Sequence, residues 1–592
     1  MPAARATRRD GEDPGRRTPD RRGARHERPM LVDALDRACA RQDCEPGMRS
    51  MVDSARGAFA RGAWREACDA LSAAAEAGSL PAEDFERLAV AAYLVGEDDV
   101  CAHAWECAHR SALEAGDGAT AARCAVLLSL CLFLKGQMAT AGGWLARAER
   151  VLADAGPGCP ASGYVLILRL LGALGTEPTL AADLAVRAAE VGMRSGDADL
   201  RALGVLGHGQ ALIAMGEVSE GVGRLDEVMV SVTSGEVGPV VTGIVYCAVI
   251  IECLRLHDIG RASEWTAALG DWCDAQPELV PYRGQCLVHR SQLQQIAGRW
   301  SEAITAAGAA CRYLADPPHP AIGLAYYQEG ELHRLRGDLD HAEADYREAN
   351  RYGHDPVPGI ALLELARGEA PSAVVTIGRA LQEYHQPLER PALLAAAVEI
   401  RRAAGDLGGA RAAAEELAAV AAGGSSAVLR AMAADALGTV LAGEGHVVAA
   451  LVELRTAAAV WRSLGMPYET ARTAVAVGLA CAAMGDGVAS ALELGNARNT
   501  FVELGARPDV ERLDVLMSSG VPADGGATLS DREREVLSEL AAGKTNREIA
   551  GTLVISQHTV GRHVESIFAK LGVTSRAAAT AYAYEHDLLS AR

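Results

Sequence analysis

The chain has 592 residues, which is too long for one hydrophobic core and indicates several domains or an array of repeats. Hydrophobic residues make up 49% of it but aromatic residues only 4%, a composition that favours closely packed helices over sheets rich in β-branched and aromatic side chains. The net charge of −20 excludes a broad nucleic-acid-binding surface, because such a body repels phosphate backbones.

The first 29 residues contain nine arginines against five acidic residues and almost no large apolar side chains. Such a segment buries too little apolar surface to fold, so we expect a disordered tail over residues 1–29. Two interpretations remain open. The tail could be a basic arm that binds DNA. It could instead have no such role, or translation could begin at Met30, so that the tail is not part of the protein.

The fourteen cysteines include no CxxC pair, and the chain shows no secretory signal and no apolar run of about 18 residues. These features predict a cytoplasmic protein without a membrane span, whose thiols act as small apolar fillers. The densest cluster is Cys101, His103, Cys107 and His109. Its spacing scatters the side chains around a helix, so we predict packing there, and no metal or cofactor, although a metal site stays the alternative.

A glycine recurs through residues 30–517 at intervals of 31 to 44 residues, each time between two apolar patterns typical of helices. These glycines are Gly62, Gly96, Gly136, Gly175, Gly216, Gly260, Gly298, Gly337, Gly368, Gly405, Gly445 and Gly485. In several repeats an alanine follows five residues later, at Ala67, Ala141, Ala303, Ala342, Ala373, Ala410 and Ala450. Glycine ends a helix in the left-handed conformation, and alanine lets the next helix approach closely. The pattern therefore predicts helical hairpins.

The clearest unit is Tyr327–Tyr352, with a turn at Gly337-Asp338. One hairpin cannot cover its own apolar face, so roughly a dozen must stack into a superhelix. The spacing and the glycine-to-alanine pattern resemble tetratricopeptide repeats. The predicted fold class is therefore all-α, with a tetratricopeptide-like α-solenoid that receives a protein partner or a ligand. A generic α-solenoid without a binding groove is the alternative.

One stretch departs from this pattern. Glu264–Arg290 concentrates polar and aromatic side chains, at Trp265, Trp272, Pro277, Pro281, Tyr282 and His289. These groups could line a concave ligand or partner site, or form a longer loop packed against its neighbours.

Residues 518–527 are rich in Gly, Ser, Pro and Asp and are predicted to link the repeats to a separate domain over residues 528–592. In that domain Ser530-Asp531-Arg532-Glu533 and Thr545-Asn546-Arg547-Glu548 are capping boxes. Further helix starts are expected at Ser556 and near Ser575. Two short helices joined tightly at Val554-Ile555 define a helix-turn-helix, whose second helix can enter the major groove of DNA.

That second helix is amphipathic. Its apolar side chains, Val560, Val564, Ile567, Phe568 and Leu571, recur at helical spacing and are expected to point inward. The opposite face then carries Gln557, His558, Gly561, Arg562, Glu565 and Lys570. We expect this face to meet double-stranded DNA.

The segment from Leu529 to Ala583 resembles the LuxR-type (GerE-like) C-terminal domain. The landmarks are Leu529, Arg532-Glu533, Glu535-Val536-Leu537, Gly543, Asn546, Glu548-Ile549-Ala550, Leu553, Ser556, Thr559-Val560, His563, Ile567, Lys570-Leu571 and Arg576. The resemblance covers about a tenth of the chain and implies a four-helix DNA-binding domain of a bacterial transcription regulator.

The same resemblance implies DNA contacts from both helices of the motif. The implied residues are Thr545, Asn546, Arg547, Ser556, Gln557, His558, Thr559, Gly561, Arg562, His563 and Lys570. Of these, Thr545, Asn546, Ser556 and Thr559 would fix the helices on phosphates, with Lys570 adding a charge. For Thr545 and Ser556, helix capping alone is the alternative, although both roles can coexist.

The sequence departs from the family at Gly561, where a lysine is usual, and the cation lies instead at Arg562. A guanidinium there could read guanine O6 and N7, so Arg562 is the first candidate for base recognition. Gly561 could let the backbone approach the groove closely. Glu565 could accept from cytosine N4 or pair with Arg562.

Residues 528–592 contain eight basic and eight acidic side chains, so one copy of the domain should bind weakly. A homodimer on a palindromic site is therefore expected, with half-sites near one helical turn, about 10 bp, apart. The resemblance places its contact on the fourth helix, at Ala578, Ala581 and Tyr582. Packing of that helix onto the third is the alternative.

Enzymatic chemistry finds no support in the sequence. Gly543-Lys544-Thr545 lacks the upstream glycine of a phosphate-binding loop, because that position is Ser538. No nucleophile elbow or HExxH pair is present, so an enzyme hidden near Trp265 has no recognisable catalytic group. The sequence predicts a non-enzymatic, sequence-specific transcription regulator. The alternative is a helical scaffold with a weak or vestigial DNA-binding domain.

Overall fold

The computed structural model describes residues 46–78, 80–155, 159–276, 278–315, 319–424, 426–518, 529–553, 555–571, 573 and 575–585. Throughout these ranges the elements are helices and none is a strand. The all-α prediction is therefore confirmed. The predicted tail at 1–29 and all but the first residue of the predicted linker lie outside the described residues.

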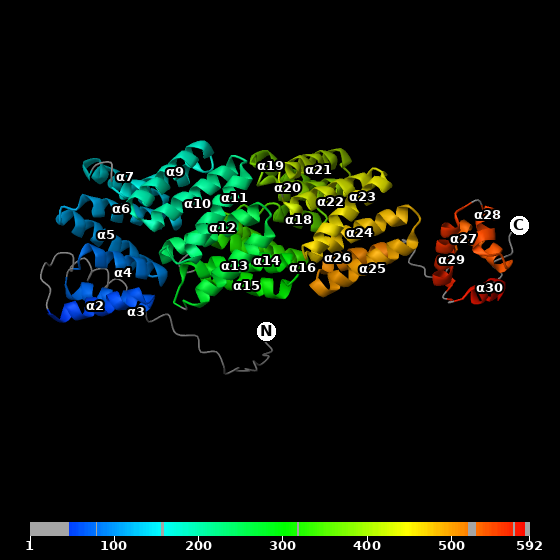
Figure 1. Cartoon of the computed structure of the whole chain (residues 1–592), viewed down its shortest axis with the longest axis horizontal. Coiled ribbons are helices and arrows are strands. Elements are labelled where there is room, and N and C mark those ends of the chain that lie inside the picture. Colours follow the sequence, from blue (N-terminus) through cyan, green and yellow to red (C-terminus); the bar gives the residue numbers. More distant parts are fainter. Residues whose placement is uncertain are drawn as a thin grey trace, which may run out of the picture. The chain divides into compact units, whose positions relative to one another are not determined.

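The chain divides into two compact units, and the division falls inside α22 (Ala427–Gly443). The first unit holds twenty complete helices in its described part, coloured from blue to yellow-green in Figure 1. These are α2 (Pro46–Ala60), α3 (Trp64–Ala77), α4 (Ala82–Leu94), α5 (Asp98–Glu114), α6 (Gly118–Leu134), α7 (Met138–Ala155), α8 (Ala161–Ala173), α9 (Pro178–Ser195), α10 (Ala198–Ala214), α11 (Val218–Thr233), α12 (Pro239–Arg255), α13 (Ile259–Asp274), α14 (Pro281–Ile296), α15 (Trp300–Leu314), α16 (Ile322–Arg336), α17 (Leu339–Arg351), α18 (Gly359–Ala366), α19 (Ala370–Glu383), α20 (Arg390–Ala403) and α21 (Leu407–Ala422).

The second unit contains the last repeat helices and a smaller C-terminal bundle. The repeat helices are α23 (Val447–Ser463), α24 (Pro467–Ala483), α25 (Gly487–Leu504) and α26 (Arg507–Ser518). The bundle consists of α27 (Asp531–Ala541), α28 (Asn546–Leu553), α29 (Gln557–Leu571) and α30 (Arg576–Glu585). Ser518, predicted as the first linker residue, is the last residue of α26.

The repeat helices pair as antiparallel hairpins, as the glycine pattern predicts. In the Tyr327–Tyr352 unit, α16 ends at Gly337, whose φ of 82° is a left-handed conformation that favours glycine. On α17, Ala342 and Tyr346 are buried, and the Tyr346 ring lies where a side chain at Gly330 of α16 would have to be. A small residue on one helix thus admits the partner helix, which is how ridges pack into grooves.

An aspartate often follows the turn glycine and starts the second helix. The side chains of Asp117, Asp197, Asp406 and Asp486 each accept a hydrogen bond from the backbone N–H three residues on, at 2.8 to 3.0 Å. Such a cap satisfies one of the unpaired N–H groups at a helix start and is worth about 1 kcal/mol.

Two predicted turn glycines behave differently from the others. Gly260 lies inside α13, and the left-handed position belongs instead to His257, with φ of 56°. Asp258 then caps α13 by accepting from Arg261 N at 3.1 Å. The prediction of a turn at Gly260 was therefore wrong by three residues, because a histidine occupies the glycine position there. Gly175 follows α8 but does not adopt positive φ.

The first unit winds back on itself. Val280 N, in the α13–α14 connection, donates to Leu94 O at the end of α4 over 2.9 Å. Gln276 accepts from Trp64 Nε1 at 2.9 Å, and Glu278 accepts from Arg65 N at 2.8 Å. The bonds of Gln276 and Glu278 join residues 212 and 213 positions apart in the sequence, as a superhelix does when successive turns touch.

The aromatic stretch Glu264–Arg290 belongs to that contact. Tyr282 is buried, donates to Val240 O at 2.7 Å and lies 6.0 Å from the Trp272 ring. Its ring contacts α12 so closely that a Cβ at Gly243 would lie 2.2 Å from it. His289 is also buried. The structure thus favours the packed alternative over a ligand-lined surface for these aromatic groups.

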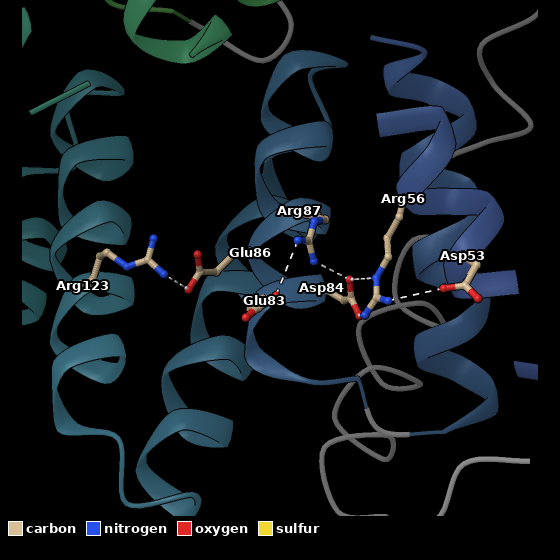
Figure 2. Close-up of polar contacts among 7 residues, drawn as sticks. All are labelled: Asp53, Arg56, Glu83, Asp84, Glu86, Arg87 and Arg123. Atoms are coloured by element: carbon tan, nitrogen blue, oxygen red, sulfur yellow. Dashed lines mark hydrogen bonds and ion pairs between the residues drawn. The ribbon is translucent and has the colours of Figure 1, made fainter. Parts of the chain in front are cut away.

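A buried ionic network ties α2 to α4 at the start of the array (Figure 2). The Asp84 carboxylate is fully buried and accepts from Arg56 Nε and Nη2 at 2.9 and 2.7 Å and from Arg87 Nη1 at 2.7 Å. Beside it, Arg123 Nη2 of α6 donates to Glu86 at 2.7 Å. A buried carboxylate must be paired in this way, because desolvation without partners is costly.

The histidines and cysteines of the α5 cluster pack among helices. His109 Nδ1 lies 2.7 Å from Ala121 O, and Arg147 Nε donates to His109 Nε2 at 2.9 Å, so the chain itself engages both ring nitrogens. Cys107 Sγ lies 3.4 Å from His103 Nε2. Within the described ranges no group of three or more His, Cys, Asp or Glu side chains is arranged to hold a metal ion. None of the helices described is both long enough and apolar enough to span a membrane.

Candidate nucleic-acid interface

The C-terminal bundle has a core of its own, formed by apolar side chains from all four helices. Its buried members are Leu529, Val536, Leu537, Leu540, Ile549, Val560, Val564, Ile567, Ala579 and Ala583. The inward side chains predicted for α29 are confirmed at Val560, Val564 and Ile567; Phe568 is half-buried against the core, and the Leu571 side chain lies outside the described residues. The core holds α27, α28 and α29 in a tri-helical arrangement, with α30 packed against α27 and α29.

The predicted capping box at the start of α27 is present. Glu533 N donates to Ser530 Oγ at 3.2 Å, and Ser530 N donates back to Glu533 Oε2 at 2.8 Å. Glu533 is almost fully buried, and its second oxygen accepts from Ser566 Oγ of α29 at 2.7 Å. One carboxylate thus caps α27 and also fixes α29 against it. The first role is predictable from the spacing of Ser530 and Glu533, whereas nothing in the sequence indicates the second.

The start of α28 has the second predicted capping box. Thr545 donates to Glu548 Oε2 through both its N–H and its hydroxyl, each at 2.8 Å, and Glu548 N donates to Thr545 Oγ1 at 3.4 Å. The N–H and the hydroxyl of Thr545 lower the pKa of Glu548, because both favour its charged form. The donors of Thr545 are therefore engaged inside the domain, which fits the capping alternative for this residue.

The start of α29 is capped by Ser556. Its hydroxyl accepts from Thr559 N at 3.0 Å and lies 2.7 Å from the Thr559 hydroxyl. Ser556 is exposed and Thr559 partly exposed, so these hydroxyl groups lie at the surface beside the helix N-terminus. The first turn of a helix presents unpaired N–H groups and a partial positive charge, which suits a phosphate oxygen.

The two faces of α29 differ as expected. Val560 and Ile567 are fully buried, whereas Gln557, His558 and Arg562 are exposed. Glu565 is exposed on the same side as Arg562. Gly561 is partly exposed, and an added Cβ would meet nothing within 4 Å, so packing inside the domain does not require a glycine there.

The cations of the bundle fall into two groups. Lys544 pairs with Glu539, and Arg532 donates to Leu553 O at 2.6 Å, so both are engaged by the domain itself. Arg547 and Arg562 are exposed, and neither makes a hydrogen bond or ion pair with any part of the chain that the structure describes. The pairing of Glu565 with Arg562 that the sequence left open is not formed.

Asn546 is held by a contact that the sequence did not predict. Arg576, at the start of α30, donates from Nη1 to Asn546 Oδ1 at 2.9 Å and from Nη2 to Lys544 O. This clamp fixes the loop before α28 and leaves the amide N–H groups of Asn546 as donors. In the sequence Arg576 is only one of the positions that match the family, and such a match does not indicate which residue it contacts.

The expected dimer residues lie on α30. Ala578 is partly exposed and Ala581 is exposed, while their neighbours Ala579 and Ala583 are buried in the core. The outer and inner faces of α30 are thus distinct. His563 is partly exposed on α29, and the side chains of Lys570 and Tyr582 lie outside the described residues.

Comparison with known proteins identifies this bundle. Residues 527–583 match the family described as bacterial regulatory proteins of the luxR family. The predicted resemblance of this domain is confirmed: the chain carries a LuxR-family helix-turn-helix domain after its helical repeats.

Curated relatives match a short part of the chain. The transcriptional regulatory protein MctR of Rhizobium johnstonii is 34% identical over 105 residues, which cover 18% of this chain and 46% of MctR. The nitrate/nitrite response regulator NarP of Escherichia coli is 46% identical over 61 residues, 10% of this chain and 28% of NarP. The uncharacterised transcriptional regulatory protein YhcZ of Bacillus subtilis is 47% identical over 60 residues, with the same coverage. The chain therefore spans less than half the length of these relatives.

Among solved structures, the Cut9 and Hcn1 hetero-tetramer of APC/C is similar over 82% of this chain and 98% of its own, with a TM-score of 0.40 and 13% identity. Yeast Tom70 is similar over 81% of this chain and 97% of its own, with a TM-score of 0.25 and 12% identity.

Proposed function

We propose that the protein is a sequence-specific DNA-binding transcription regulator whose helical repeats receive a protein or small-molecule signal. The observation that carries the proposal is the outer face of α29, where Arg562 is exposed and unpaired within the described residues. A cation without an internal partner, on a helix held rigidly by a packed core, is ready to bind an outside acceptor.

In the proposed complex α29 lies in the major groove. Arg562 donates to guanine O6 and N7, a bidentate contact worth about 1 to 3 kcal/mol of discrimination. Gln557 and His558, exposed in the first turn of α29, lie within reach of neighbouring base edges.

Phosphates bind around the two helix starts. The free N–H groups of the first turn of α29 donate to one phosphate, together with whichever hydroxyl of Ser556 and Thr559 does not donate to the other. Arg547 and the amide N–H groups of Asn546 donate at the start of α28, with His563 and Lys570 as further contacts. Thr545 contributes mainly by capping α28, because Glu548 occupies its donors.

Gly561 supports close approach of the helix backbone to the groove. A glycine inside a helix costs about 0.5 to 1 kcal/mol relative to alanine, and the fold gives no steric reason for it here. An external partner that needs the space of a side chain accounts for a glycine at this position.

Two copies are proposed to act together on DNA. The domain has equal numbers of acidic and basic side chains, so phosphate attraction alone gives one copy little affinity. The exposed part of α30, with Ala578 and Ala581, is the proposed contact between the copies, and Tyr582 is the third residue expected to take part. Their two α29 helices would then reach half-sites about 10 bp apart.

The proposal is tested by selecting the preferred site from random duplexes with the full chain, then measuring affinity against salt. We expect a palindromic site. Arg562→Ala should cost about 1 to 3 kcal/mol and relax specificity at one base pair per half-site. Arg547→Ala should weaken binding to all sequences alike and lower the salt slope by about 1.

Arg462→Ala, which removes an exposed arginine from repeat helix α23, is the charge-matched control and should leave binding unchanged. The alternative function, a helical scaffold whose DNA-binding domain is weak or vestigial, predicts no selected site and no binding at any salt concentration. That result would refute regulation.

The role of Gly561 has a matched pair of variants. Gly561→Ala and Gly551→Ala both replace an unobstructed helix glycine, so each should stabilise its helix by about 0.5 to 1 kcal/mol. Only Gly561→Ala should also weaken DNA binding. Equal affinity of both variants for the selected site would remove the proposed role of Gly561.

A further inference from the structure

Two cysteines face each other across the α5–α6 hairpin. The turn of this hairpin is at Gly116, and Cys101 of α5 and Cys131 of α6 lie at equal distances along the chain from it. In an antiparallel pair of helices with the same rise per residue, this register places the two positions opposite one another. Both thiols line one cavity of about 110 Å³.

Cys131 is the more exposed of the two residues that line the cavity. Among the described cysteines, Cys131 alone is not buried, whereas Cys101 is. A volume of this size holds several water molecules or one small oxidant.

The groups around Cys131 stabilise its thiolate. The neighbouring Cys101 thiol and the charge of Lys135 lower the pKa of Cys131, against the opposing effect of burial. The interaction with Cys131 and burial raise the pKa of Cys101, which therefore stays a thiol. The buried Trp105 indole N–H, which has no hydrogen-bond partner in the described residues, also lowers the pKa of Cys131.

Lys135 is held at the cavity by specific contacts. Its Nζ pairs with Asp98 Oδ1 at 2.5 Å and lies 5.5 Å from the centroid of the Tyr93 ring. Lysine occurs at only three positions in this chain, where arginine supplies nearly all the positive charge, and the other two lie in the C-terminal bundle. A compact, strongly localised cation next to a thiol is the arrangement that favours a reactive cysteine.

We propose that Cys131 is a peroxide-reactive thiol and Cys101 its resolving partner, so that a hydroperoxide closes a disulfide between α5 and α6. The Cys131 thiolate attacks the terminal peroxide oxygen, the O–O bond breaks, and the leaving oxygen takes a proton to give water or an alcohol. Cys131 is thereby oxidised to the sulfenic acid and the peroxide is reduced. Cys101 then attacks the Cys131 sulfur, the S–S bond forms, the S–O bond breaks, and the thiol proton leaves with the hydroxyl as water.

A second cysteine pair in the same unit provides an internal comparison. Cys273 and Cys286 also interact, and the bond from Cys273 lowers the pKa of Cys286. Both are buried, with exposed fractions of 2% and 4%, so an oxidant has no direct access to either. Cys131 therefore differs from Cys286 in its greater exposure. A neighbouring thiol that stabilises the thiolate is common to both residues and does not distinguish them.

The test exposes the reduced full chain to hydrogen peroxide, alkylates the remaining thiols and maps the peptides by mass spectrometry. We expect one early product, a Cys101–Cys131 disulfide lacking two hydrogens. In Cys101→Ala, the reagent dimedone should trap a sulfenic acid at Cys131. Lys135→Gln should slow the reaction about tenfold or more, whereas Lys135→Arg, which keeps the charge, should stay within about threefold.

Cys286→Ser is the matched control and should leave the rate at Cys131 unchanged. Circular dichroism of each variant establishes that the helices are retained. Oxidation of Cys131 no faster than of Cys286 in the wild-type chain, or no dimedone adduct at Cys131 in folded Cys101→Ala, would overturn the proposal.

Discussion

Replacement of Glu533 by alanine should loosen the whole C-terminal bundle. The carboxylate is 5% exposed and accepts from Ser530 N at 2.8 Å and Ser566 Oγ at 2.7 Å, which joins the cap of α27 to α29. Its removal leaves two donors without their partner, and hydrogen bonds to a charged group contribute about 1.5 to 3 kcal/mol each. Allowing for relaxation and entry of water, we expect the domain to lose about 2 to 4 kcal/mol.

Two further variants separate the role of this carboxylate from effects of charge. Glu533→Gln keeps an acceptor in the capping box and should cost about 1 kcal/mol. Glu535→Ala removes an exposed carboxylate from the same helix, one that only pairs with Arg532 at the surface, and should cost less than about 1 kcal/mol.

The assay is amide hydrogen exchange of the intact chain, read in α27 and α29, because a multi-unit protein has no single unfolding transition. The expected order of protection is wild type and Glu535→Ala, then Glu533→Gln, then Glu533→Ala. Unchanged protection in Glu533→Ala would refute the reasoning, as would equal losses in the alanine and glutamine variants at position 533.

Three other predictions concern the repeat array. Asp84→Ala should destabilise the first helices by about 2 to 4 kcal/mol, because it removes the buried acceptor that joins Arg56 of α2 to Arg87 of α4 and leaves each guanidinium only a longer contact on its own helix, to Asp53 and Glu83; faster hydrogen exchange in α2 and α4 would show it, and unchanged exchange would contradict it. Gly243→Ala should cost about 1 to 3 kcal/mol, because the new methyl group would overlap the Tyr282 ring, whereas Gly172→Ala, with open space around it, should be neutral or stabilising; unchanged hydrogen exchange in α12 and α14 of Gly243→Ala would show that this packing is not tight. Burial lowers the pKa of His289 to about 4 in the folded chain, below its ordinary value. As pH falls from about 6.5 to 4, the unfolded chain therefore takes up the extra proton before the folded chain does. The free energy of unfolding should fall over this range by up to about 3 kcal/mol. His289→Asn should flatten the stability profile of the first unit in that pH window, and a profile of the same slope as the wild type would contradict this assignment.

The helical hairpins were predictable because each depends on a local signal. Most turn glycines adopt positive φ where the spacing placed them, and the alanines five residues later are buried. The exception at His257 shows the limit of this signal, since the left-handed conformation is set by the backbone and a non-glycine residue can occupy it. The contact between Val280 and Leu94 has no local signal, because it depends on how many hairpins complete one superhelical turn.

The C-terminal bundle was predicted in more detail for the same reason. Capping boxes and a 3.6-residue apolar pattern determine both the helix starts and the buried face of α29. The bonds of Glu533 to Ser566 and of Arg576 to Asn546 join residues about 30 positions apart, and no spacing rule indicates such partners. The sequence therefore identified the exposed face of α29 but not the contacts that hold it in place.

The most direct test asks whether Arg562 contacts the N7 atom of one particular guanine. Each guanine of the selected site is replaced in turn by 7-deazaguanine, which lacks the N7 acceptor, and affinity is measured for the wild-type chain and for Arg562→Ala. The account predicts one guanine per half-site where the wild type loses about tenfold or more in affinity and the variant loses nothing further. Equal losses in both proteins at every guanine, or no loss in the wild type at any, would contradict it.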